Sequence, residues 1–178
     1  MDMSVGAPPD PFSPTGQNWD LPPLNPMMLK HTGYEKFVRL LRENMRLYGI
    51  LRIDHVMALC RLWWVAGKTA DFGAYVHYDA DVMFAILALE SRRNRCVVIG
   101  EDLGTVPDQA RYLLNRYQVF SYKVVYFSKG WHGFELPEEY PEQAITVVST
   151  HDVAPLAGYW TGKDLDLMFR LGTIPDAE

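Results

Sequence analysis

Three acidic side chains follow apolar runs of the sequence, each at a point where a strand is expected to end. Asp54 and Glu101 directly follow such runs, and Asp152 comes shortly after another, residues 144–149. Short apolar runs bounded by turn signals are typical of buried strands. Parallel α/β folds place their reactive groups at the carboxyl ends of the strands. These three carboxylates are therefore the first candidates for chemistry in this chain.

Carboxylates gathered at one edge of a sheet suit more than one kind of site. A pair about 5–5.5 Å apart can cleave a glycosidic bond with retention, one as nucleophile and one as acid, while a third stabilises the transition state. Three acids also suit a divalent metal in a lyase or hydrolase, for which Lys123 is the candidate base. A groove that binds glucans without catalysis is the third possibility. The residue types alone leave all three open.

The neighbours of the acids add detail to the first possibility. Arg52 precedes Asp54 by two residues, so the two side chains point to the same side of an extended strand. The Arg52 charge would keep the carboxylate ionised and oriented, as a nucleophile must be, although a purely structural ion pair has the same pattern. His55 and His151 stand beside two of the acids and are suited to hydrogen-bonding sugar hydroxyls.

The elements that must position these groups alternate between strand and helix. Such alternation indicates a parallel sheet, and acids at three of four strand ends favour an α/β fold that is part of a (β/α)8 barrel, with about four parallel strands and covering helices. The connections at 56–78 and 128–143 are expected to be irregular. The expected strands are 50–54, 96–100, 122–127 and 145–149, and the expected helices are 34–48, 81–94, 107–117 and 164–171.

The N-terminal segment differs in composition from the rest. Residues 1–26 hold most of the prolines and show no periodicity, so we expect a loop there, with neither strand nor helix. We interpret residues 1–32 as a proline-rich lid over a substrate groove and residues 33–178 as a half-barrel within one catalytic domain. In the lid, the Gln17 amide can bind hydroxyls and the Trp19 indole can stack on a sugar ring.

Composition narrows the classes of partner and compartment. A formal net charge of -5 argues against binding to nucleic acid or to anionic membranes. Cys60 and Cys96 form no Cys-x-x-Cys pair, which argues against a disulfide scaffold and fits a reducing, cytoplasmic compartment. We see no leader peptide and no apolar run of membrane-spanning length. The aromatic content of 13% suits a cleft that binds sugars.

Five segments, in order along the chain, carry a resemblance to a known family. They are GAPPD at 6–10, GQNW at 16–19, LRIDHV at 51–56, IGEDLGTVP at 99–107 and THD at 150–152. Through them the sequence resembles the 4-α-glucanotransferases, also called amylomaltases or disproportionating enzymes (glycoside hydrolase family seventy-seven). The resemblance covers essentially the whole chain.

This resemblance implies a fold, a reaction and a set of roles. It implies a (β/α)8 barrel that transfers α-1,4-glucan segments between maltooligosaccharides by a retaining double displacement, without a metal or organic cofactor. Asp54 would be the nucleophile, Glu101 the acid/base and Asp152 the stabiliser of the transition state. The substrate-binding residues that the resemblance implies are Arg52, His55 and His151 beside the donor sugar, and Asp10, Gln17 and Trp19 in the lid on the acceptor side.

Two departures from the family pattern and the short length add further expectations. Asp20 stands where the family usually has glycine, and residues 153–156 lack the threonine that often follows the His-Asp pair. Four strands make half a barrel, so we expect a fragment of a larger enzyme that is inactive alone. We also expect its open sheet edges to favour self-association.

Overall fold

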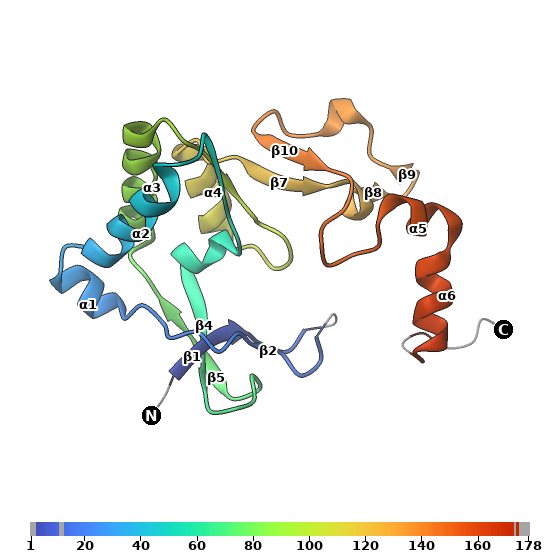
Figure 1. Ribbon diagram of the computed structural model, residues 1–178, viewed down its shortest axis with the longest axis horizontal. Coiled ribbons are helices and arrows are strands. Elements are labelled where there is room, and N and C mark those ends of the chain that lie inside the picture. The colour runs from blue at the N-terminus through green and yellow to red at the C-terminus, as the bar shows by residue number, and fades with distance from the viewer. Residues whose placement is uncertain (1–2, 11–12, 173, 175–178) are drawn as a thin grey trace. The chain divides into compact units, whose positions relative to one another are not determined.

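Two parallel strands, β3 (Ile50–Ile53) and β6 (Val97–Gly100), form the sheet at whose end Asp54 and Glu101 lie. The computed structural model describes residues 3–10, 13–172 and 174, and Figure 1 shows its elements along the chain. Ile99 of β6 also forms a parallel bridge to Phe120 on its other side. Both strands coincide with predicted ones to within one residue at each end.

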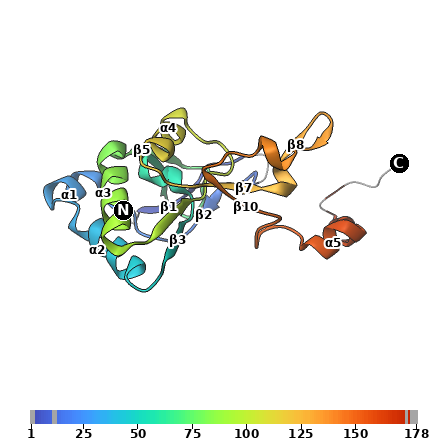
Figure 2. The ribbon, with the colours of Figure 1, turned by 90° about the horizontal axis from the view of Figure 1, so that it is seen from above.

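The chain divides into two units, Met1–Ser121 and Tyr122–Glu178. In the first unit, helices pack against the parallel strands, and Figure 2 shows α1, α2 and α3 gathered on one side of it. On α2, the buried residues Phe37, Leu41 and Met45 recur every four positions, so one stripe of the helix faces the core. The three longer helices of this unit confirm the predicted ones: α2 (Glu35–Met45), α3 (Ala80–Asn94) and α4 (Asp108–Arg116).

The main core of the first unit lies between these helices and the strands. Its most deeply buried side chains come from α2, α3, α4 and the turn after β3, so helices far apart in the sequence share one apolar interior. Burial of this kind stabilises the layer that holds the strand ends in place. The largest of these side chains are Met45, Val56, Phe84, Leu87, Leu113 and Val119.

A buried carboxylate ties α2 to α3. Glu90 on α3 is 1% exposed, and its oxygens accept hydrogen bonds from Arg42 Nε at 2.7 Å, Arg42 Nη2 at 2.9 Å and Arg93 Nη1 at 2.9 Å. Chiefly through the hydrogen bonds from Arg42, and despite burial, the pKa of the Glu90 carboxyl lies below its ordinary value. A lowered pKa means that the folded state binds the ionised form more favourably than the unfolded state does.

We expect Glu90→Gln to destabilise the fold by about 1–3 kcal/mol at pH 7, because charged hydrogen bonds are lost. Because the folded-state pKa is lowered, this contribution is complete above about pH 4.3, the value of a free glutamate, and disappears as the pH falls through the folded-state pKa. Urea unfolding at pH 7 and pH 3 should show a difference between the two proteins that shrinks in acid. The control is Glu43→Gln in the exposed Glu43–Arg46 pair on α2, which should change little at either pH.

An antiparallel sheet in the order β2-β1-β4-β5 corrects two predictions made from the sequence. Residues 1–26, expected to hold neither strand nor helix, contain β1 (Met3–Ala7) and β2 (Gln17–Asn18). The connection at 56–78, expected to be irregular, contains β4 (Arg61–Ala66) and β5 (Gly73–His77).

The reason for both errors is that these strands depend on distant partners. β1 pairs with β4 from Met3↔Ala66 to Gly6↔Trp63, and neither strand shows the alternation that marks a half-buried strand by itself. Gly6 lacks a side chain at a point where a Cβ atom would collide with the carbonyl oxygen of Gln17, so β1 and β2 approach closely there.

A short helix inside the predicted lid was also missed. α1 (Pro26–His31) begins after Asn25, whose Oδ1 accepts hydrogen bonds from the N–H groups of Met27 and Met28 at 2.9 and 3.1 Å. An asparagine cap followed by proline at the first helical position is a start signal that the sequence does carry. The start signal was not used, because the many prolines nearby indicated a loop.

Two strands pair with each other in the second unit, β7 (Ser121–Val124), whose first residue is the last of the first unit, and β10 (Ala144–Val147). In Figure 1 their arrows point the same way. Both are shorter than the predicted 122–127 and 145–149, because residues Val125–Phe127 form a 3-10 turn and β10 ends at Val147.

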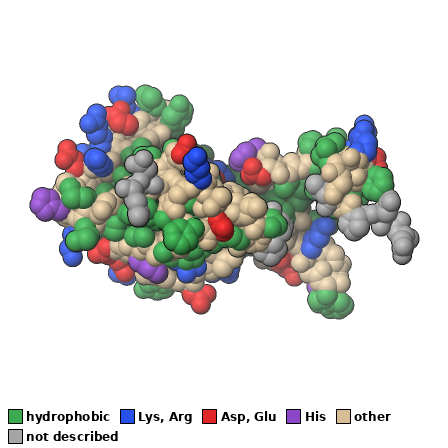
Figure 3. Space-filling model, turned by 90° about the horizontal axis from the view of Figure 1, so that it is seen from below, with side chains coloured by type: hydrophobic (Ala, Val, Ile, Leu, Met, Phe, Trp, Pro, Cys, Tyr) green, Lys and Arg blue, Asp and Glu red, His purple; other side chains and the backbone are tan. Residues whose placement is uncertain are grey.

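The rest of the second unit contains a hairpin and two helices. The segment 128–143, expected to be a loop, forms the hairpin of β8 (Lys129–Gly130) and β9 (Gly133–Phe134). The helix α6 (Lys163–Arg170) confirms the predicted 164–171, whereas α5 (Leu156–Thr161) was not predicted. Hydrophobic side chains of these helices reach the surface, as Figure 3 illustrates, among them Leu156, Trp160, Leu165, Leu167, Met168 and Phe169. Across the described residues, the structure has no helix long and apolar enough to cross a membrane.

Candidate active site

The turns after β3 and β6 are joined by backbone hydrogen bonds. The Glu101 N–H donates to Ile53 O at 2.8 Å, and Val56 N–H donates to Glu101 O at 2.8 Å. These bonds extend the parallel register Ile53↔Gly100 by one step beyond the strands. Asp54 and Glu101 therefore emerge from the same edge of the sheet, as the sequence predicted.

The Glu101 side chain is the buried acid of this edge, with 8% of its surface exposed. Its Oε2 accepts a hydrogen bond from the His55 N–H at 2.7 Å, and its Oε1 accepts one from the Leu103 N–H at 2.7 Å. Each oxygen is thus fixed by a backbone donor, which holds the carboxyl group in one orientation. An oriented, water-shielded carboxyl group is the form that proton transfer requires.

Asp54 has the opposite environment, since 75% of its side chain is exposed. Arg52 Nη1 lies 2.7 Å from Asp54 Oδ1, which confirms the predicted pairing of residues two apart on one side of the strand. The guanidinium holds the carboxylate in one orientation. An oriented, accessible carboxylate can attack an electrophilic carbon or bind a cation.

His55 occupies the turn between the two acids, with a left-handed backbone conformation at φ 47°. Burial lowers the pKa of its imidazole, an effect that the charges of Glu101 and Asp54 partly oppose. The ring is therefore neutral at pH 7, with one nitrogen as donor and the other as acceptor. A neutral imidazole can bind a hydroxyl group in either direction.

Trp19 brings the N-terminal segment to this turn. Its ring lies edge-on to the His55 ring, with centroids 5.5 Å apart. The Trp19 backbone N–H donates to Val5 O at 2.9 Å, and its indole Nε1–H donates to Gln17 Oε1 at 3.0 Å. The structure thus places Trp19 against the predicted site residue His55, held there by β1, and brings Gln17 to Trp19.

Asp10 takes part in a local turn. Its Oδ1 accepts a hydrogen bond from the Ser13 N–H at 2.6 Å, and the two residues exchange backbone hydrogen bonds as well. Residues 1–2 and 11–12 of the predicted lid lie outside the described residues. In the described part of the segment, the turn at Asp10 leads into β2 and so toward Gln17 and Trp19.

Asp20, the departure from the family pattern, has φ 53°. Non-glycine residues rarely adopt this left-handed region, which explains why glycine is the expected residue there. Asn18 Oδ1 accepts a hydrogen bond from the Asp20 N–H at 2.9 Å, forming a turn closed by a side chain. This bond supports the unusual conformation at Asp20.

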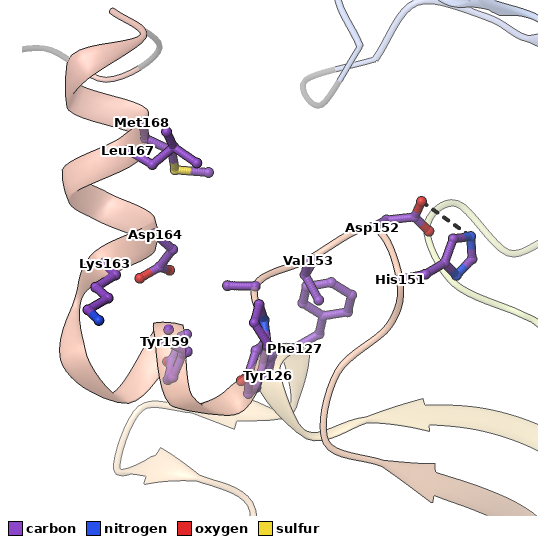
Figure 4. Close-up of a pocket in the computed structure, with 13 residues that line it drawn as sticks. Tyr126, Phe127, His151, Asp152, Val153, Tyr159, Lys163, Asp164, Leu167 and Met168 are labelled. Atoms are coloured by element: carbon purple, nitrogen blue, oxygen red, sulfur yellow. Dashed lines mark ion pairs between the residues drawn. The ribbon is translucent and has the colours of Figure 1, made fainter.

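His151 and Asp152 belong to the second unit. His151 Nε2 lies 3.4 Å from Asp152 Oδ1, and the Asp152 N–H donates to Thr150 Oγ1 at 3.2 Å. Both side chains line a pocket of about 760 Å³ built from residues of this unit, which Figure 4 shows. A volume of this size is typical of small-molecule sites.

The pocket contains aromatic residues that the sequence reasoning did not assign to a site. Tyr126 and Phe127 line it from the end of β7, and Tyr159 lines it from α5. The expected strand 122–127 contained the first two, whereas in the structure they lie in the 3-10 turn that follows β7. No site was expected there, because the segment ends in aromatic side chains and not in acidic ones.

The described residues form no group of three or more His, Cys, Asp or Glu side chains arranged to hold a metal ion. Within the first unit, the site instead combines an exposed, paired carboxylate with a buried carboxyl group, a neutral imidazole and an indole. This combination fits the first of the chemistries considered above, namely attack by one carboxylate and proton transfer by another.

Comparisons with known proteins show which family the sequence is similar to. The family model described as 4-alpha-glucanotransferase matches residues 1–173. A 4-alpha-glucanotransferase of Haemophilus influenzae is 53% identical over 98% of this chain and 25% of its own length. A 4-alpha-glucanotransferase of Mycobacterium tuberculosis is 41% identical over 97% of this chain and 25% of its own length.

Two solved structures of amylomaltases resemble the fold of this chain. The crystal structure of amylomaltase from Corynebacterium glutamicum matches 99% of this chain and 25% of its own, with a TM-score of 0.91 and 37% identity. An amylomaltase from Streptococcus agalactiae in complex with acarbose matches with a TM-score of 0.79 and 22% identity, over 99% of this chain and 37% of that one. The chain spans about a quarter of the length of these two curated relatives, from Haemophilus influenzae and Mycobacterium tuberculosis.

Proposed function

The chain belongs to the 4-alpha-glucanotransferase family, and from this premise we propose that it carries the catalytic groups of a retaining α-1,4-glucan transferase. The observation that carries the proposal is that two acids in different environments lie at one edge of the sheet. Asp54 is exposed and forms an ion pair with Arg52, whereas Glu101 is buried and accepts hydrogen bonds from two backbone N–H groups. A retaining enzyme needs one carboxylate of each kind.

In the first step, Asp54 attacks C1 of the donor glucosyl unit while Glu101 gives its proton to the departing 4-oxygen. The glycosidic bond breaks, a glucosyl ester of Asp54 forms, and the leaving chain departs as an alcohol. In the second step, Glu101 takes the proton of an acceptor 4-hydroxyl, whose oxygen attacks C1 and releases Asp54. Asp152 stabilises the positive charge that develops on the sugar ring in both steps.

The remaining site residues bind substrate in this proposal. Arg52 and His55 contact the donor sugar beside Asp54, and His151 does so beside Asp152. Gln17 and Trp19, with Asp10 at the base of the segment, form the acceptor side, where the indole can stack on a pyranose face. By excluding water there, the segment favours a sugar hydroxyl as the attacking group, which makes the enzyme a transferase instead of a hydrolase.

The substrates proposed are maltooligosaccharides and longer α-1,4-glucans. For the fold, we propose that β3, β6, β7 and β10 are consecutive strands of a (β/α)8 barrel, in which the rest of the relatives' length supplies the other strands. Because the chain spans a quarter of that length, we expect the 178 residues alone to be inactive and to self-associate through exposed apolar faces and strand edges.

The test is incubation of maltotriose with the chain extended to the length of its relatives. We expect a ladder of longer maltooligosaccharides together with glucose, unaffected by a chelator. The 178-residue chain, assayed in parallel at the same concentration, should give no ladder.

Three results that differ from these expectations would each contradict part of the proposal. A ladder that a chelator removes would favour the metal-dependent alternative. Binding of maltotriose without a ladder, by a folded full-length protein, would favour a glucan-binding role without catalysis. A ladder from the 178 residues alone would overturn the claim that the rest of the fold is required.

A further inference from the structure

We infer that Tyr126, Tyr159 and Asp164 form a further glucosyl-binding site in the second unit, in which Asp164 recognises a hydroxyl of the sugar beside the one at Asp152. The inference rests on the proposed function and names residues to which that function assigns no role. All of them line the pocket that also contains His151 and Asp152.

The floor of the pocket is a pair of stacked phenol rings. The rings of Tyr126 and Tyr159 lie with centroids 4.2 Å apart and planes inclined by 23°, as Figure 4 shows at the base of the site. Lys129 Nζ lies 2.7 Å from the Tyr159 hydroxyl oxygen, which fixes that ring from the hairpin side. A fixed aromatic surface beside polar groups is the usual platform for the apolar face of a pyranose ring.

The hydroxyl of Tyr126 is an unexplained polar group. Tyr126 is 9% exposed, and its hydroxyl has no hydrogen-bond partner among the residues that the structure describes. Buried polar groups are nearly always paired, so an orphan at a pocket wall points to a partner that arrives from outside the chain. Burial raises the pKa of Tyr126, with smaller contributions from Tyr159 and Asp164, so the phenol remains a protonated donor.

Asp164 supplies the complementary acceptor. It lies in the first turn of α6, is partly buried and lines the pocket, while Leu167 and Met168 continue the same wall as apolar side chains. A hydroxyl group can accept a hydrogen bond from Tyr126 and donate one to Asp164 at the same time. A sugar offers such a hydroxyl together with an apolar face for the tyrosine floor, which a water molecule does not.

The experiment compares four proteins at the length of the relatives: wild type, Asp164→Asn, Tyr126→Phe and the control Asp166→Asn. Asp166 lies on the same helix but is exposed and does not line the pocket. In maltotetraose disproportionation, we expect Asp164→Asn to raise KM about tenfold, as loss of one charge-assisted hydrogen bond would. We expect kcat to stay within about twofold, since Asp164 does not touch the reacting atoms.

Tyr126→Phe separates a binding role from a structural one. It removes a hydroxyl that has no partner among the described residues, so a purely structural role predicts unchanged or higher thermal stability together with an unchanged KM. The inference instead predicts a KM raised about threefold without loss of stability, smaller than for Asp164 because the bond lost is uncharged.

The outcomes distinguish this inference from the proposed function. If the wild type is active and both variants keep its KM, the inference is overturned and the proposed function stands. If the wild type gives no ladder, the proposed function fails, and calorimetric titration with maltotetraose decides the inference alone. Binding weakened about tenfold by Asp164→Asn supports it, whereas equal affinity, or no binding by the wild type, overturns it.

Discussion

Replacing Asp54 with asparagine is expected to abolish glucan transfer, lowering kcat by about 10⁴-fold or more, the scale on which loss of a single essential group acts in hydrolases. Asparagine keeps the size of the side chain but cannot form the glucosyl ester through which both steps pass. Because the side chain is largely exposed, the substitution should leave the unfolding midpoint nearly unchanged. The measurement is the initial rate of glucose release from maltotriose.

Intact-protein mass spectrometry makes this test specific to a covalent role. After mixing with a slowly released glucosyl fluoride, the wild type should gain the mass of one glucosyl unit and Asp54→Asn should not. Asp108→Asn is the matched control, because Asp108 is an exposed aspartate in the same unit, at the start of α4. A variant at position 54 that keeps a tenth of the activity, or still gains the label, would remove Asp54 from the role of nucleophile.

Glu101→Gln is expected to reduce both activity and stability. Loss of the acid/base should lower kcat by about 10²–10⁴-fold. Both Glu101 oxygens face backbone N–H donors, from His55 and Leu103, so the glutamine NH₂ must turn toward one of them. Two donors then face each other without an acceptor, which should cost about 1–3 kcal/mol in the free energy of unfolding.

Two measurements separate these effects. Thermal or urea unfolding reports the cost of the mismatched donor, and activity on a donor with a good leaving group reports the acid role. Departure of fluoride needs no proton, so maltosyl fluoride should restore formation of the covalent maltosyl-enzyme in the variant. The neighbouring Asp102→Asn is the control for charge. Equal losses on maltotriose and maltosyl fluoride would show that Glu101 acts only through the fold.

The strand ends of the first unit could be predicted from sequence because their signals are local. An apolar run followed by an acid identifies the end of β3 and of β6, and a two-residue spacing is enough to pair Arg52 with Asp54. The helices α2, α3 and α4 were predicted for the same reason, since their apolar periodicity lies within each segment. From the rest of the chain, these elements need only an apolar core against which to pack.

The antiparallel sheet could not be predicted, because its signal is not local. β1 and β4 satisfy their backbone groups only through each other, and nothing within either segment specifies the partner. The Trp19–His55 contact depends on this sheet. The sequence therefore did not predict how the N-terminal segment reaches the site. The pocket was missed for a different reason, namely that α5 was not predicted and its Tyr159 completes the aromatic floor.

The pairing of β1 with β4 also bears on the order in which the first unit assembles. Contacts between α2 and α3, and between β3 and β6, join segments closer in sequence than Met3 and Ala66. Closing a longer loop costs more entropy, although each doubling adds only about 0.6 kcal/mol, and distant pairings slow folding. The helical layer and the parallel strands can therefore form before β1 docks. Trp19, whose backbone N–H is bound to Val5 O of β1, would then be fixed against His55 only when β1 docks.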